Sequence, residues 1–294
     1  MQPALPRAVA AILLMACAAP ALADDPPVPA GLDPGGEAIA LITDGVDYTD
    51  TEIAGRLARD GEGEPITLDL VDGDVRPYAA PGDGRGTRFA KIALAAYPSS
   101  RLIIVRAAPT DPASLARAVM FASRTPARVV ALSFWGRDPE TWKPFAEAAR
   151  MASQVAFVLP GGTPAARRQG DVFPAAFNLP NAVVAADLKV SDLQVGSKLA
   201  VDAWLGTKVD QDYLVPLDAA VPDSKVRSAG PDIEDAVDGV AFVAAVAACF
   251  TAPSLTGAGI KEELLERAPF SGQGRQFFDL SFTCNLSHRP HEKM

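Results

Sequence analysis

Histidine, the most common catalytic base, is confined to one end of this chain, and its position limits the chemistry of the domain. The 294-residue sequence contains two histidines, His288 and His291, and both lie in its last few residues. Chain ends of this kind fray, so neither imidazole is expected within hydrogen-bond reach of a serine in the body of the chain, such as Ser133, Ser224 or Ser228. The sequence therefore argues against a histidine-based catalytic triad.

Metal and cofactor motifs are also missing. The sequence has no HExxH segment, no cluster of cysteine and histidine, and no EF-hand loop. Asp69, Asp72 and Asp74 form a small acidic loop, which we interpret as a solvated turn. We expect neither a metal nor a cofactor.

Composition places the chain among globular α/β proteins. Hydrophobic residues make up 49% and charged residues 21% of the sequence, which argues against disorder. The formal net charge of -9 repels phosphate backbones and anionic lipid surfaces. A nucleic-acid partner is therefore not expected.

Residues 1–23 have the pattern of a signal peptide. Arg7 provides a positive start, Ala8 to Met15 form an apolar stretch too short to span a membrane, and Ala21-Leu22-Ala23 is a small-x-small cleavage site. We predict cleavage after Ala23 and a periplasmic or secreted protein without membrane insertion. A lipid anchor at Cys17 is the alternative.

The rest of the chain divides into three parts. Residues 24–36 are rich in proline and glycine and are interpreted as a linker, residues 37–287 as one domain, and residues 288–294 as a flexible tail. Cys249 and Cys284 remain after cleavage. In an oxidising compartment they could form a disulfide, and the alternative is two buried free thiols.

Within the domain, apolar runs alternate with segments of helical periodicity. This alternation predicts an α/β fold with a doubly wound, mostly parallel sheet and helices on both faces. Strands are expected at Glu37–Ile42, Arg101–Arg106, Arg128–Phe134, Val155–Leu159 and Ala182–Ala186, with a less regular piece at Tyr213–Leu217. Helices are expected at Arg88–Tyr97, Asp111–Ser123, Pro139–Ser153, Gly239–Phe250 and Gly259–Arg267.

The ordered series of segments resembles the subtilases, the subtilisin-like serine peptidase family. IALITDGVDYTDTEI resembles the family's aspartate block, GRGTRFAKIALAA its Gly-His-Gly-Thr block, ALSFWG the segment lining the substrate groove, AFVLPGG the block with the oxyanion asparagine, and GVAFVAAVAAC the nucleophile block. The matches follow the family's order from Ile39 to Ala268. The resemblance implies the subtilisin fold, with its site at the carboxyl ends of the strands.

The catalytic positions implied by the resemblance carry other residues here. The aspartate position falls on Thr43, the histidine position on Arg85, the serine position on Ala241 and the oxyanion asparagine position on Gly162. Arginine stays protonated and is no base, alanine has no hydroxyl, and glycine has no side-chain donor. Moving the register to Val240 supplies no nucleophile either.

Two nearby carboxylates could interact with Arg85. Asp44 follows Thr43, and as the next residue of a strand it is expected to point to the opposite face, unless a twisted strand end brings it back. We predict that Arg85 pairs with Asp44 or Asp83. A solvated surface arginine is the alternative.

The resemblance and the substituted positions together indicate a pseudopeptidase. An extended peptide could add as a strand along the groove segment, with Ser133, Phe134 and Gly136 as the candidate contacts. The partner would be a protein or peptide that the sequence does not identify. The alternatives are an active or atypical serine peptidase and a structural scaffold.

Overall fold

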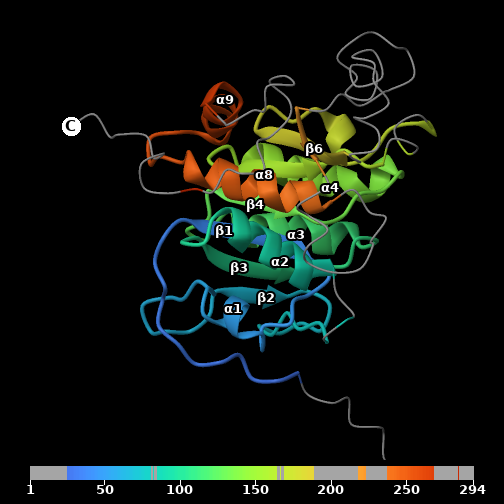
Figure 1. Cartoon of the computed structure of the whole chain (residues 1–294). Coiled ribbons are helices and arrows are strands. Elements are labelled where there is room, and N and C mark those ends of the chain that lie inside the picture. Colours follow the sequence, from blue (N-terminus) through green and yellow to red (C-terminus); the bar gives the residue numbers. More distant parts are fainter. Residues whose placement is uncertain are drawn as a thin grey trace, which may run out of the picture.

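A computed structural model describes residues 25–80, 82, 85–163, 166, 169–188, 218–222, 237–267 and 284. The predicted signal segment, the piece at Tyr213–Leu217, the tail at 288–294 and Asp83 lie outside the described residues. The described part forms a sheet between layers of helices (Figure 1).

The sheet has seven strands in the order β2-β3-β1-β4-β5-β6-β7, and every pairing is parallel. Their bounds are β1 Ala38–Thr43, β2 Thr67–Asp69, β3 Arg101–Arg106, β4 Val129–Leu132, β5 Ala156–Pro160, β6 Ala182–Leu188 and β7 Ala219–Pro222. From β1 the chain runs to the edge strand β2, returns to β3 beside β1, and then crosses to β4 and continues outward through β5, β6 and β7. The predicted doubly wound parallel sheet is confirmed.

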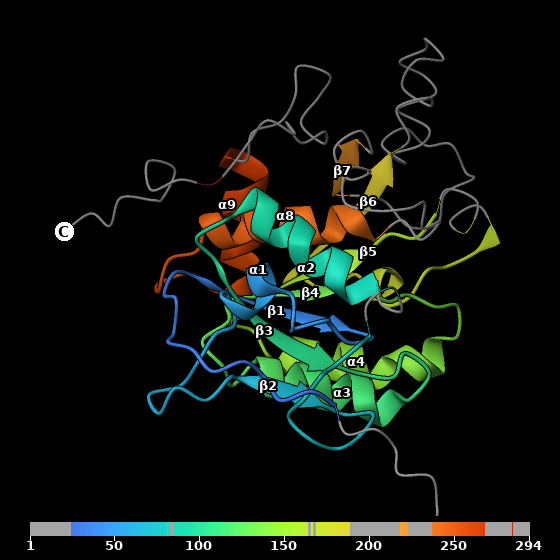
Figure 2. The same ribbon diagram turned by 60° about the horizontal axis from the view of Figure 1, so that its bottom comes forward.

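Helices cover both faces of the sheet (Figure 2). One face carries α2 (Arg85–Ala96), α8 (Asp238–Cys249) and α9 (Gly257–Arg267), and the other carries α3 (Pro112–Ala122) and α4 (Pro139–Met151). The short elements are α1 (Thr51–Ala54) and the 3-10 turn η1 (Ala175–Phe177). Every residue of α8 after Asp238 is buried, as its apolar character on all sides predicts.

Strand β1 is continuously apolar because both of its faces are covered by helices. Ile39 and Leu41 pack against α2 and α8, whereas Ala40 and Ile42 pack in the core beneath α3 and α4. Side chains alternate along a strand, and here both faces are covered. The same alternation directs Thr43, the last residue of β1, toward α2.

The structure moves several predicted boundaries. Helix α2 begins at Arg85 rather than Arg88, and α9 begins at Gly257 rather than Gly259. The sequence analysis missed β2 because its three residues, Thr-Leu-Asp, form no apolar run. It also missed β7, a short strand beyond the expected piece.

The segment predicted to be a linker lies against the domain. In this N-terminal strap (residues 25–36), the hydroxyl of Tyr48 donates to Pro26 O at 2.6 Å and Arg76 Nη1 donates to Asp25 O at 2.9 Å. Asp33 accepts hydrogen bonds from the Arg59 backbone at 2.9 Å and from Arg101 at 2.6 Å. Proline and glycine content indicated a linker and did not predict these contacts.

A disulfide joins Cys249, the last residue of α8, to Cys284. The backbone N–H of Cys284 also donates to Ala96 O, at the end of α2, with a distance of 3.0 Å. The bridge therefore places Cys284 against the C-terminal ends of both helices. In the described part of the chain, no helix combines the length and the apolar character needed to cross a membrane.

Candidate functional site

The strand order reverses between β1 and β4, and ligands of open α/β sheets bind at the carboxyl ends of strands at such a point. Thr43 ends β1 here and faces the first turn of α2. A Cβ at Gly86 would collide with Gly45 O and Thr43 Oγ1, so only glycine permits this approach of α2 to β1. Thr87 Oγ1 then accepts the Asp47 N–H at 2.8 Å. Gly86 and Thr87 thus fix the position of α2 against the end of β1, whichever residue occupies position 85.

Asp44 corrects an expectation. Its carboxylate does not turn away from α2: Oδ1 accepts the Gly86 N–H at 3.1 Å and the Thr43 hydroxyl at 3.0 Å. Strand β1 has ended at Thr43, and Gly45 follows with a φ of +114°, so the alternation of a strand no longer applies. Asp44 thereby caps the N-terminus of a helix far along the chain, where its negative charge is favourable.

Arg85 lies beside this carboxylate. Its Nε is 3.5 Å from Asp44 Oδ2, and the two side chains are 33% and 30% exposed. Such a pair adds at most about 1 kcal/mol to folding because water screens it. Chemically, a permanent cation occupies the place that the resemblance assigned to a base.

The start of α8 carries no nucleophile. Val240 and Ala241 are both fully buried. Arg88 in the first turn of α2 reaches Asp238, the first residue of α8, with Nη2 2.6 Å from Oδ2. An ion pair with little exposure therefore links the ends of the two helices at which the resemblance placed histidine and serine.

Gly162 follows β5 and adopts a φ of +71°. A Cβ at this position would lie 3.0 Å from both Cγ atoms of Val172. The left-handed conformation and the close valine favour glycine here. Asparagine tolerates this φ better than other side chains, so the close valine is the main obstacle to an asparagine at the oxyanion position.

The three groove candidates lie in different surroundings. Ser133 is fully buried, and its Oγ has no hydrogen-bond partner among the described residues. Phe134 is also buried, in the core beneath α3 and α4. Gly136 is half-buried and exchanges two backbone hydrogen bonds of 2.9 Å with Phe173. The side chains of Ser133 and Phe134 are therefore not exposed groove contacts, because both belong to the interior.

Trp135 is the groove-segment residue that the sequence analysis missed. It is half-buried and packs against the α2 and α8 side of the core, opposite to Phe134. Within the described part of the chain, the backbone groups of Phe134 and Trp135 make no hydrogen bond, whereas Ser133 and Gly136 on either side do. The alternation of side chains along an extended segment could have identified Trp135, because Phe134 beside it points to the opposite face.

No protein-family model matches the sequence, and no curated protein matches it either. Several solved structures are similar. A cold-adapted subtilisin-like serine proteinase has a TM-score of 0.54 at 17% identity, over 87% of this chain and 89% of that chain. A lanthipeptide protease has a TM-score of 0.60 at 15% identity, over 84% and 86%. MycP1 with its N-terminal propeptide removed has a TM-score of 0.56 at 17% identity, over 87% and 92%.

These similarities extend along most of each chain, so the domain has the fold of subtilisin-like proteases. At this level of identity they establish the architecture, while activity depends on the residues at the site.

Proposed function

We propose that this domain is a pseudopeptidase, a subtilisin-like fold that binds an extended peptide or protein segment without cleaving it. The observation that carries the proposal is the start of α8, where the serine position holds Ala241, fully buried and without a hydroxyl. Acyl transfer in such enzymes requires a nucleophile, a base and an oxyanion donor together. The alanine removes the first requirement.

The neighbouring positions support the same proposal. Arg85 pairs with Asp44 and is permanently protonated, so it takes no proton from a nucleophile. Gly162 has no side-chain donor and sits in a conformation that favours glycine. Ser133 is the serine of the groove segment, but its hydroxyl is buried and no histidine lies among the described residues.

Binding is supported by Trp135, which is half-buried and whose backbone groups make no hydrogen bond within the described part of the chain. An extended segment can hydrogen-bond to these backbone groups, while the half-buried indole supplies apolar contact. The location at the switch point of the sheet, where ligands of open α/β folds bind, agrees with this role.

Export to the periplasm or the exterior is part of the proposal. The signal-like residues 1–23 support it, and so does the disulfide between Cys249 and Cys284, because such bonds persist in oxidising compartments. The partner would then be an exported or cell-surface polypeptide.

A covalent probe tests the absence of catalysis. The mature chain is incubated with a serine-reactive fluorophosphonate, with subtilisin as the positive control, and labelling is followed by intact mass. We expect no adduct. An adduct that disappears when one serine is replaced by alanine would establish an active or atypical peptidase instead.

Photocrosslinking tests the binding role. A photoreactive phenylalanine is placed at Trp135 and, as the matched control, at Met151, an exposed apolar residue at the end of α4. Both proteins are presented with an array of extended peptides. We expect sequence-dependent crosslinks from position 135 only. Equal labelling from both positions, or none from either, would favour a scaffold without a peptide groove.

A further inference from the structure

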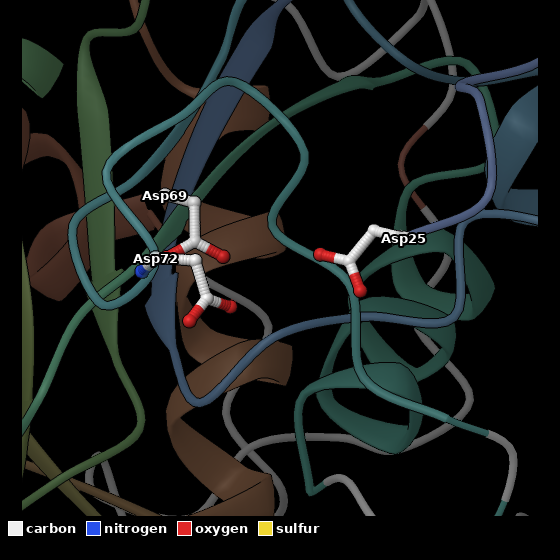
Figure 3. A group of neighbouring side chains, drawn as sticks. All are labelled: Asp25, Asp69 and Asp72. Carbon is white, nitrogen blue, oxygen red and sulfur yellow. The ribbon is translucent and has the colours of Figure 1, made fainter. Parts of the chain in front are cut away.

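An acidic group lies beside the sheet edge formed by β2. Asp69 is the last residue of β2, Asp72 lies in the loop that follows, and Asp25 belongs to the N-terminal strap. One carboxylate oxygen from each lies within 4.8 Å of the others. Figure 3 shows Asp69 and Asp72 adjacent, with the Asp25 carboxylate turned toward them. Three negative charges this close repel one another unless a cation joins them.

Asp69 is fully buried, so the interpretation of the loop as a solvated turn is wrong for this residue. Its Oδ1 accepts the N–H groups of Val71 at 2.7 Å and Asp72 at 2.9 Å. Its own N–H donates to Asp74 O at 2.9 Å. The loop is therefore built around the Asp69 carboxylate, and a buried carboxylate needs a compensating charge.

Arg106 supplies that charge. It ends β3 in register with Asp69, which places both side chains at the same edge of the sheet. Its Nη1 lies 2.9 Å from Asp69 Oδ2 and also pairs with Asp72, while its Nε donates to Asp44 O at 3.1 Å. One guanidinium thus holds the acidic loop, β2 and the end of β1 together.

We propose that the Arg106 guanidinium is the resident cation of this acidic group, taking the position between Asp69 and Asp72 that a divalent ion would need. Both oxygens of Asp69 are already engaged, Oδ1 by two N–H groups and Oδ2 by Arg106. A metal ion at the same oxygens would lie beside a fixed positive charge. The loop and the strap therefore keep their structure without an added cation.

Of the three carboxylates, that of Asp25 in the N-terminal strap has the weakest contact with a positive charge. Arg76 Nη1 binds the carbonyl of Asp25 rather than its carboxylate, and Arg76 Nε lies 3.6 Å from Asp74. Burial, followed by repulsion from Asp72, raises the pKa of the Asp25 carboxyl. Removing Arg106 would thus leave three carboxylates without their main counter-charge and should release the strap first.

Thermal melting of the mature chain with EDTA, MgCl2 or CaCl2 tests the proposal. The melting temperature of the wild type should be the same in all three. Arg106→Met should melt roughly 5–10 °C lower in EDTA, because a largely buried carboxylate loses its partner, and CaCl2 should restore a large part of the loss. Isothermal titration with CaCl2 should detect binding to this variant and none to the wild type.

Arg101→Met is the matched control. Arg101 begins the same strand and pairs with the single carboxylate of Asp33, at 2.6 Å. Its replacement should lower the melting temperature without any recovery in CaCl2, because one carboxylate makes no cation site. Recovery of both variants would indicate a general effect of calcium and overturn the assignment.

A variant without the paired carboxylates covers the case in which Arg106→Met does not fold. Adding Asp69→Asn and Asp72→Asn to Arg106→Met removes the two carboxylates that Arg106 pairs with, the buried one included, and should restore folding without any cation. Stabilisation of the wild type by CaCl2 would overturn the proposal. So would a loss in Arg106→Met that neither calcium nor the two asparagines relieve.

Discussion

Arg88 Nη2 lies 2.6 Å from Asp238 Oδ2, with the two side chains only 10% and 13% exposed. Their positions are separated by 150 residues, and the contact ties the first turn of α2 to the first residue of α8. The disulfide and the Cys284 N–H fasten the same two helices at their other ends. The helices that would carry a catalytic base and nucleophile are thus held together at both ends.

Breaking the Arg88–Asp238 pair should destabilise the domain strongly. Arg88→Met leaves the Asp238 carboxylate with little solvent, and we expect the free energy of unfolding to fall by roughly 3 kcal/mol. Urea denaturation measures the loss. Adding Asp238→Leu should cost less than the two single losses combined, because the unpaired charge is then gone. Additive losses would show that the two residues do not depend on one another.

Restoring a hydroxyl at the serine position should not restore catalysis. In Ala241→Ser the new hydroxyl lies in a fully buried position, and we expect a loss of ~1–3 kcal/mol if it finds no partner. Combining it with Arg85→His should still give no fluorophosphonate adduct, because the new hydroxyl is buried, Thr43 offers no carboxylate to orient the histidine, and Gly162 has no side-chain oxyanion donor. Intact mass spectrometry is the measurement. An adduct in the double variant would show that the site retains more catalytic geometry than we propose.

A side chain at Gly162 should destabilise the domain. Gly162→Ala forces a non-glycine residue to a φ of +71° and brings its Cβ against Val172. The conformation alone costs roughly 1–2 kcal/mol. Gly35→Ala is the control, since its φ is +67° but nothing lies within 4 Å of the added Cβ. Chemical denaturation should therefore show a larger loss for position 162, and equal losses would mean that the Val172 contact has no effect.

The disulfide should stabilise the domain under oxidising conditions. Its cysteines are 35 positions apart, and closing a loop of this length contributes about 3–4 kcal/mol in the chain-entropy description. We expect dithiothreitol to lower the melting temperature of the wild type and to leave the double variant Cys249→Ser, Cys284→Ser unchanged. A wild type insensitive to complete reduction would argue that the bridge has no role in stability.

The ion pair between Asp50 and Lys91 should make the stability of the domain depend on pH in the acidic range. Lys91 Nζ lies 2.6 Å from Asp50 Oδ2, and this hydrogen bond holds the pKa of the Asp50 carboxyl below its ordinary value of 3.8. A lowered folded-state pKa means that the contribution is present above 3.8 and disappears as pH falls through the lower value. The difference in melting temperature between the wild type and Asp50→Asn should therefore shrink as the pH falls below 3.8. A constant difference would contradict this linkage.

Much of the architecture could be predicted from the sequence because its causes are local. Strand β3 was predicted with its observed bounds, since a short apolar run framed by Arg101 and Arg106 has the length of a buried strand. The all-apolar Gly239–Phe250 segment indicated a central helix for the same reason. Chain order and the glycine frame around Arg85 then suggested the family whose fold the solved structures share.

The residues themselves also determined what chemistry is missing, because no fold can give Ala241 a hydroxyl or turn Arg85 into a base. Only the tertiary structure decided how the remaining groups are used. It turned Asp44 onto α2 once β1 had ended, buried Phe134 while leaving Trp135 half-exposed, and brought Arg106 to the buried Asp69. Those outcomes depend on strand ends and on contacts between distant segments, and the pattern of neighbouring residues carries little information about either.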